Sequence, residues 1–150
     1  NTGVELTSTY TTDLLGAEAK YWANAAIVDG TLNEFGVNHD LPYTTNIKLK
    51  AGLTLNWRDK YILTTRLHWI GPTNGGVGTA GVDAPSHAVV YLHGQILDVL
   101  TKGMDLQLTI NNLFDQRYYE SGDGSCGGGS GLNQVPQDPR WVKIALKYRF

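Results

Sequence analysis

The sequence has 150 residues, of which 41% are hydrophobic and 17% charged, and its formal net charge is −2. This length suits a single domain, and the charged fraction is low against the roughly 25% of an ordinary soluble domain. The charge balance gives no electrostatic case for nucleic-acid binding, and the single cysteine, Cys126, excludes an internal disulfide and a Cys-based zinc site.

Strict two-residue alternation of apolar and polar side chains is the main local pattern, and it predicts strands because a helix would scatter these residues around its circumference. The first expected strand is rich in threonine, and the clearest pair forms a hairpin across the short turn 58–60. The seven expected strands cover residues 3–12, 17–28, 47–57, 61–69, 88–98, 104–111 and 140–150. We therefore expect an all-β fold, an antiparallel meander of about seven strands.

The strand and loop lengths favour a transmembrane β-barrel. Most of the expected strands have about the 9–11 residues that a tilted strand needs to cross a bilayer, which exceeds the usual five or six of soluble sheets. Short turns are expected at 13–16, 58–60 and 99–103, and long loops at 29–46, 72–87 and 116–139. Short turns on one side and long loops on the other are typical of outer-membrane barrels.

Aromatic residues at the strand ends support the same interpretation. Trp57 and Tyr61 flank one short turn, and Trp69 stands near the opposite rim. Rings at these places suit a membrane-interface girdle, because each ring then has one apolar and one hydrated neighbour. The alternative is a soluble barrel or sheet in which the aromatic and other apolar residues fill a core.

Two motifs resemble those of a known family. Residues 111–119 contain Asn112, Leu113, Phe114, Asp115 and Tyr118, an arrangement similar to the "NLFD…Y" motif near the end of TonB-dependent receptors. The C-terminal strand alternates hydrophobic residues, among them Tyr148, and ends in Phe150, which resembles the signal that outer-membrane proteins present to the barrel-assembly machinery.

The resemblance implies a fold, a function and a set of partners. The chain would form the C-terminal strands of a barrel of about 22 strands, as a single domain over residues 1–150, as a fragment and without the plug domain. The function would be energy-coupled uptake of a scarce, siderophore-like ligand across the outer membrane of a Gram-negative type of cell, with no enzymatic activity. The partners would be outer-membrane lipid, the remaining strands and plug, the barrel-assembly machinery and, through the plug, a TonB-type coupling protein.

The candidate site residues lie on the polar strand face, which would line the lumen. Cations outnumber the acids Glu5, Glu18 and Asp105 there, so they would contact a plug, bias the lumen toward anionic solutes or simply hydrate the wall. These possible lumen-facing cations are Lys48, Lys50, Arg66, Lys143, Lys147 and Arg149.

No residue pattern indicates a cofactor, a metal site or catalysis. The histidines, at positions 39, 68, 87 and 93, match no ligand spacing, and a weak contact from Asp83 and His87 has no further support. The glycine-rich run 121–131 lacks the Lys-Ser/Thr of a phosphate-binding loop and is expected to be a flexible loop.

A second hypothesis stays open. Seven strands leave two open edges, which lipid would not tolerate. The chain could instead be a structural β protein that pairs these edges with copies of itself in a closed or filamentous assembly.

Overall fold

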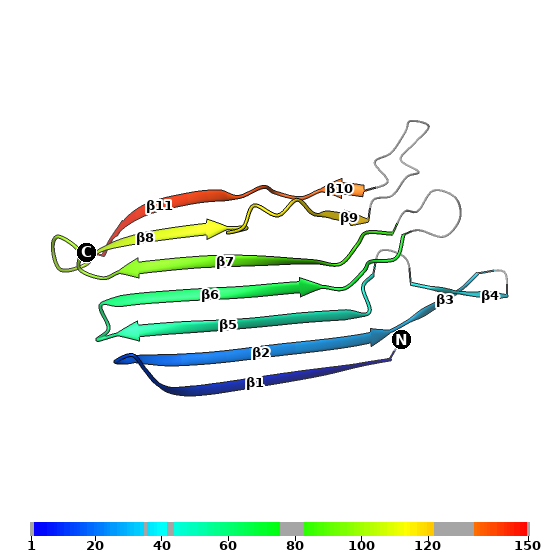
Figure 1. Cartoon of the computed structure of the whole chain (residues 1–150), viewed down its shortest axis with the longest axis horizontal. Coiled ribbons are helices and arrows are strands. Elements are labelled where there is room, and N and C mark those ends of the chain that lie inside the picture. Colours follow the sequence, from blue (N-terminus) through cyan, green and yellow to red (C-terminus); the bar gives the residue numbers. More distant parts are fainter. Residues whose placement is uncertain (1, 35, 42–43, 76–82, 122–133, 150) are drawn as a thin grey trace.

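The fold is a single large antiparallel sheet with two small hairpins at one end (Figure 1). The computed structural model describes residues 2–34, 36–41, 44–75, 83–121 and 134–149. The strands of the large sheet, in spatial order, are β1 (Thr2–Leu14), β2 (Ala17–Asp29), β5 (Ile47–Trp57), β6 (Tyr61–Ile70), β7 (His87–Ile96), β8 (Met104–Asn111) and β11 (Trp141–Tyr148). Each strand pairs with the next in this order, which confirms the predicted seven-stranded meander.

The connections sort by length between the two ends of the sheet, as the sequence predicted. Three short turns follow β1, β5 and β7 at one end, which we call the short-turn end (Figure 1). The longer connections follow β2, β6 and β8 at the other end, the long-connection end. The first carries the hairpin β3 (Thr31–Glu34)–β4 (Val37–Asp40), and the third carries β9 (Tyr119–Ser121)–β10 (Gln134–Pro136).

The short turns form where residues with positive φ reverse the chain. Arg58 and Asp59 adopt φ values of 53° and 52°, a left-handed pair that joins β5 to β6 with the twist that a tight hairpin requires. The Asn56 amide oxygen accepts the backbone N–H of Asp59 at 3.1 Å. The turn before β8 ends at Gly103 (φ 87°), where a Cβ would lie 2.6 Å from the Arg149 carbonyl oxygen.

The strand register puts most of the large aliphatic residues of the seven strands on one face. Leu53 lies between Tyr21 of β2 and Thr65 of β6, and the same row continues outward in both directions along the sheet. The complete row is Tyr10, Tyr21, Leu53, Thr65, Leu92, Ile110 and Val142. We call the face of this row the apolar face and the opposite one the polar face.

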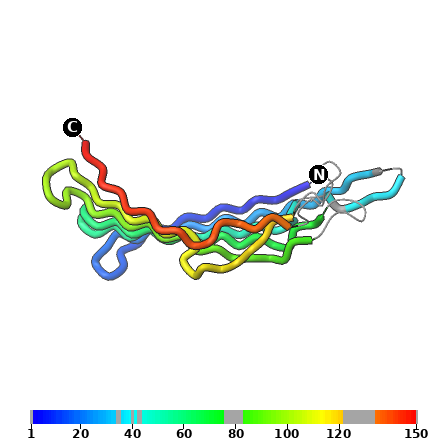
Figure 2. The backbone as a smooth tube through the Cα atoms, turned by 90° about the horizontal axis from the view of Figure 1, so that it is seen from above, coloured from blue at the N-terminus to red at the C-terminus, as the bar shows by residue number. Residues whose placement is uncertain are grey.

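None of the described residues forms a second layer over the apolar face. Figure 2 shows the sheet edge-on as one curved layer, and large side chains of this face remain exposed, including Leu67 at 41% and Ile144 at 72%. The buried apolar residues of the described chain are small: Ala17, Ala19, Ala84 and Val89. Within the described residues there is thus no water-excluding core of the kind that a soluble sandwich requires.

The expected strands are found with small shifts at their ends. The first strand extends to Leu14 and the fifth ends at Ile96, so the turn into β8 begins earlier than predicted. The two hairpins inside the long connections were not predicted, because their strands have only three or four residues and no clear alternation. Among the described residues, no helix is long and apolar enough to cross a membrane.

Candidate functional site on the polar face

A cluster of cations lies on the polar face, in the half nearer the long connections. Lys48 and Lys50 lie on β5, and Lys50 pairs with His68 of β6. Arg66 lies two residues before His68 on β6, one row nearer the short-turn end. We call Lys48, Lys50 and Arg66 the cation cluster. In the part of the chain that the structure describes, no carboxylate forms an ion pair with these three residues.

Tyr91 of β7 contacts two side chains at the centre of this surface. The guanidinium carbon of Arg66 lies 5.6 Å from the centroid of its ring, in the range of a cation–π contact. The His68 ring packs against the same tyrosine, with the ring centroids 4.8 Å apart and tilted by 53°. The two contacts hold Arg66 and His68 side by side on the polar face.

Trp22 extends this surface toward β2. Its register partner is Gly52, and a Cβ at Gly52 would lie 2.4 Å from the indole ring. The indole therefore lies directly over the backbone of β5, in the space that the missing side chain leaves. Gly52 pairs in turn with Arg66 of β6, which contacts Tyr91 of β7. The planar groups of Trp22, Arg66 and Tyr91 therefore extend over β2, β5, β6 and β7. Cations and aromatic rings on one wall can bind an anionic ligand with planar groups.

A polar hollow of about 330 Å³ lies at the end of the polar face that is next to the long connections. Lys48 and Glu120 contribute opposite charges to its lining, and the other lining residues are Thr45, Ile70, Thr73 and Ser121. The Ser121 hydroxyl donates to the Thr73 carbonyl oxygen at 3.1 Å, which ties β9 to the connection after β6.

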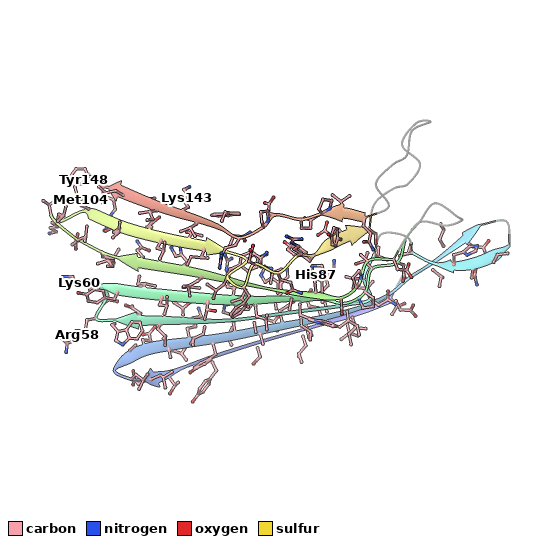
Figure 3. The ribbon with its side chains drawn as sticks, turned by 45° about the horizontal axis from the view of Figure 1, so that its top comes forward. Arg58, Lys60, His87, Met104, Lys143 and Tyr148 are labelled. Atoms are coloured by element: carbon pink, nitrogen blue, oxygen red, sulfur yellow. The ribbon has the colours of Figure 1, made fainter. Side chains whose placement is uncertain are left out.

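The other predicted cations lie away from this cluster. Lys143 and Lys147 are exposed on β11, and Figure 3 shows Lys143 beyond β8 at the sheet edge. Arg149 donates to the Asp105 carboxylate at 3.1 Å, and Asp105 is 2% exposed. This ion pair fastens the chain after β11 to β8 at the short-turn end.

The motif of residues 111–119 begins with a turn at the end of β8. Asn112 is 1% exposed, and its side-chain oxygen accepts the Gln116 N–H at 2.9 Å. Its side-chain nitrogen donates to the carbonyl oxygens of Gln116 at 2.8 Å and Asp138 at 3.4 Å. The Asp115 carboxylate accepts the Arg140 N–H at 2.9 Å. The motif thus fixes the point at which the chain leaves β8 and the point at which it returns to β11.

The remaining motif residues differ in their surroundings. The Leu113 N–H donates to the Val90 carbonyl oxygen at 2.8 Å, while the Phe114 side chain is 75% exposed. Tyr118 stacks on His87, with the ring centroids 4.5 Å apart and 29° between the ring planes. Burial raises the pKa of the Tyr118 phenol, and the charges of Tyr91, Glu120 and Asp138 raise it further. Sequence reasoning missed this stack, because His87 and Tyr118 are distant in the chain.

The predicted interface aromatics are all on the apolar face. Trp57 and Tyr61 pair across the turn at the short-turn end, and the Trp57 indole nitrogen donates to the Leu15 carbonyl oxygen at 3.3 Å. Trp69 lies on the same face near the other end of β6, about 27 Å from Tyr61 along the strand. Figure 3 shows Tyr148 at the short-turn end, on the same side of the molecule as Met104 and Lys60.

Several of the other candidate residues do not combine into a site. His39 lies on the β4 hairpin, and the His93 ring forms a hydrogen bond of 3.0 Å with Thr109. The described residues contain no group of three side chains that could hold a metal ion. Cys126, Phe150 and most of the glycine-rich run lie outside the described residues.

Comparison with known proteins supports the fold. No protein-family model matches the sequence, and no curated protein matches it. The structure is similar to that of the ferric-catecholate import receptor Fiu from Escherichia coli K12, with a TM-score of 0.66 and 18% sequence identity over 89% of this chain. The chain spans only 21% of the length of that receptor. The likeness to a TonB-dependent receptor is thus confirmed at the level of the fold: the chain has the fold of a segment of such a barrel wall.

Proposed function

We propose that the chain forms part of the wall of an outer-membrane receptor that takes up a scarce ligand with energy coupling. The observation that carries this proposal is the uncovered apolar face, which runs across strands of membrane-spanning length. The apolar face contacts lipid, and the polar face lines the lumen. Trp57 and Tyr61 mark the interface at the short-turn end, and Trp69 marks the opposite one.

The ligand is an anion, such as an iron–siderophore complex, and it passes the cation cluster. Lys50 and Arg66 supply charge that no carboxylate of the described chain neutralises, and Trp22 and Tyr91 supply planar surfaces beside it. The structural similarity to a ferric-catecholate import receptor supports this ligand class. The hollow beside Lys48 is then a polar recess next to the ligand path.

The other partners follow from the proposal that the chain forms part of the wall of a receptor barrel. The longer connections face the outside of a Gram-negative cell, and the short turns face the periplasm. The remaining strands and a plug domain complete the receptor, and the plug engages a TonB-type coupling protein. Tyr148 and Phe150 present the terminal strand to the barrel-assembly machinery. The chain itself contributes wall strands and loops and no catalysis.

Cysteine accessibility in intact outer membranes tests this proposal. In a Cys126→Ser background, single cysteines replace successive residues of β5 and β8, and a membrane-impermeant maleimide labels them from water. Positions of the polar face, such as Thr54 and Gln107, should react, while Leu53 and Leu108 should react only after detergent extraction. Equal labelling of both faces in membranes, or recovery of the protein in the soluble fraction, would refute the wall role.

A further inference from the structure

The polar hollow at the long-connection end is built by three segments that are distant in the sequence. The segments are the start of β5 with the residues before it, the end of β6 with the residues after it, and β9. Thr45 pairs with Thr73 in an isolated β-bridge, and the Gly71 N–H donates to the Ile47 carbonyl oxygen at 2.9 Å. Together with the hydrogen bond from Ser121 to Thr73, these contacts hold the walls of the hollow in place.

Two residues of opposite charge line this hollow without neutralising each other. Lys48 lies on β5 and Glu120 on β9, and both are exposed. Neither side chain forms an ion pair or a hydrogen bond with another described residue. The hollow therefore keeps one cation and one anion available for a ligand.

The other polar groups of the lining are hydroxyls, which come from Thr45, Thr73 and Ser121. The Thr45 hydroxyl donates to the Ile47 carbonyl oxygen at 3.2 Å, and the Ser121 hydroxyl donates to the Thr73 carbonyl oxygen. A hydroxyl that donates in this way still has lone pairs with which it can accept a hydrogen bond. The lining thus offers acceptors to a ligand's ammonium group and, at Lys48, a charged donor to a ligand's carboxylate.

The size and the charges of the hollow limit the group that it can bind. Its volume of about 330 Å³ lies at the low end of the range of roughly 300–1,000 Å³ that is usual for small-molecule sites. A lone anion would be repelled by Glu120, and a lone cation by Lys48. A small group that carries both charges would satisfy both residues.

We propose that the hollow binds a small zwitterionic group, with its carboxylate on the Lys48 ammonium and its own ammonium on the Glu120 carboxylate. Free amino acids carry such a group, and so does a larger ligand that ends in one. The inference deepens the proposed function and rests on it, because the hollow then opens beside the path of the imported ligand.

Saturation-transfer NMR on the complete receptor, purified in detergent, tests this proposal. The probe is γ-aminobutyrate, which carries an ammonium and a carboxylate, and the reference compounds are butyrate and butylamine, which carry one charge each. We expect γ-aminobutyrate to bind more tightly than either. Hydrogen bonds to charged groups are stronger than neutral ones, so Lys48→Gln and Glu120→Gln should each raise its Kd by about tenfold.

A matched control removes one charge of each sign away from the hollow. Lys143 lies on β11 and Glu18 on β2, and neither lines the hollow. Lys143→Gln with Glu18→Gln should leave the Kd for γ-aminobutyrate unchanged. An equal loss of binding in this double variant would overturn the inference.

Exchanging the two charges separates a zwitterion site from a simple anion site. Lys48→Glu with Glu120→Lys keeps one charge of each sign at the hollow, so γ-aminobutyrate should bind again in the reversed orientation. Butyrate binding that equals γ-aminobutyrate binding and depends on Lys48 alone would overturn the inference in favour of an anion site. An absence of γ-aminobutyrate binding would overturn it as well.

A second pair of probes distinguishes a free amino acid from part of a larger ligand. The iron(III) chelate of a catechol joined to the α-nitrogen of lysine ends in an ammonium and a carboxylate, and its side-chain-acetylated form lacks the ammonium. Faster uptake of radiolabelled iron from the first chelate, lost in Glu120→Gln, assigns the zwitterion to the imported ligand. Equal uptake together with γ-aminobutyrate binding assigns it to a free amino acid, and either source supports the inference.

Failure of the proposed function is measured separately. Aqueous maleimide labelling, in intact membranes, of cysteines that replace Leu53 and Leu108 would overturn the proposal that the chain is part of a barrel wall. Loss of the zwitterion binding alone, with the apolar face protected from the maleimide, would overturn only the assignment of the hollow.

Discussion

Asn112 shows how a single polar residue can direct a long connection. Its side chain is buried and bonds to backbone groups on both arms of the connection between β8 and β11. Its φ of 52° is one that asparagine tolerates better than most residues. These hydrogen bonds give a structural reason for an asparagine at this position.

Replacing Asn112 with alanine should destabilise the barrel wall. The change leaves the Gln116 N–H and two carbonyl groups without their partner, and each buried polar group left unpaired costs about 1–3 kcal/mol. We expect a loss of about 2–4 kcal/mol in the free energy of unfolding, measured by urea titration in lipid vesicles. Asn111→Ala is the matched control, since the Asn111 side chain forms no hydrogen bond with another described residue. Equal losses in the two variants would contradict this role of Asn112.

At the scale of elements, the end of the last strand depends on a close approach of two backbones. The Arg149 N–H donates to the Gly103 carbonyl oxygen at 2.9 Å, and the Asp98 carboxylate accepts the Gly103 N–H. Together with the ion pair between Arg149 and Asp105, these bonds hold the turn before β8 against the chain after β11. A side chain at position 103 has no room there.

Gly103→Ala should loosen the terminal strand. The added Cβ would meet a backbone oxygen, and a left-handed φ costs a non-glycine residue about 1–2 kcal/mol. We expect a lower unfolding free energy and faster hydrogen exchange of the β11 amides. Gly94→Ala is the control, because nothing lies within 4 Å of a Cβ there. If exchange in β11 were unchanged by Gly103→Ala, this contact would not fasten the strand.

The two faces of a strand should respond differently to the same charge. Leu108 lies on the apolar face of β8, and its neighbour Gln107 lies on the polar face. Arginine on the lipid side near the middle of the bilayer costs about 2–4 kcal/mol. Leu108→Arg should therefore lower the free energy of unfolding in vesicles by about this amount, while Gln107→Arg should change it little. Similar effects of both substitutions would argue against lipid contact.

At the scale of the whole molecule, charge is distributed unevenly over the polar face. The cation cluster lies toward the long connections, and no carboxylate among the described residues pairs with it, whereas Arg149 at the other end has its positive charge paired with Asp105. An anion entering from the side of the long connections would meet the unpaired charge first. The seven strands hold these residues in fixed register.

Removing two charges of the cluster should weaken ligand binding to the complete receptor. Hydrogen bonds to charged groups contribute about 1.5–3 kcal/mol each, so Lys50→Gln with Arg66→Gln should raise the Kd for an anionic ligand by about tenfold or more. Lys143→Gln with Lys147→Gln removes the same charge from the edge strand and should have little effect. Binding is measured by quenching of the receptor's fluorescence. Uptake is measured with a ligand that carries radiolabelled iron. Equal effects of the two double variants would place the ligand elsewhere.

The sequence by itself determined the class of the fold. Alternation along residues such as Leu53 and Leu55 separates two faces only in a strand, because successive side chains of a strand point to opposite sides. The lengths of the strands and connections, and the aromatic residues Trp57, Tyr61 and Trp69 at the strand ends, come directly from the order of residues. These features predicted the seven-stranded meander and the assignment of each cation to the polar face.

Only the tertiary structure decided which residues act together. The contact of Arg66 with Tyr91, the placement of Trp22 over Gly52 and the stack of His87 on Tyr118 all depend on the register between strands. A shift of one residue would move every side chain to the other face, and the hydrophobic pattern excludes that shift without naming the partners. The pairing of Arg149 with buried Asp105, and the structural role of the motif around Asn112, also needed the folded chain. Their partners are distant in sequence, and hydrogen-bond geometry between distant segments leaves no local periodic signal.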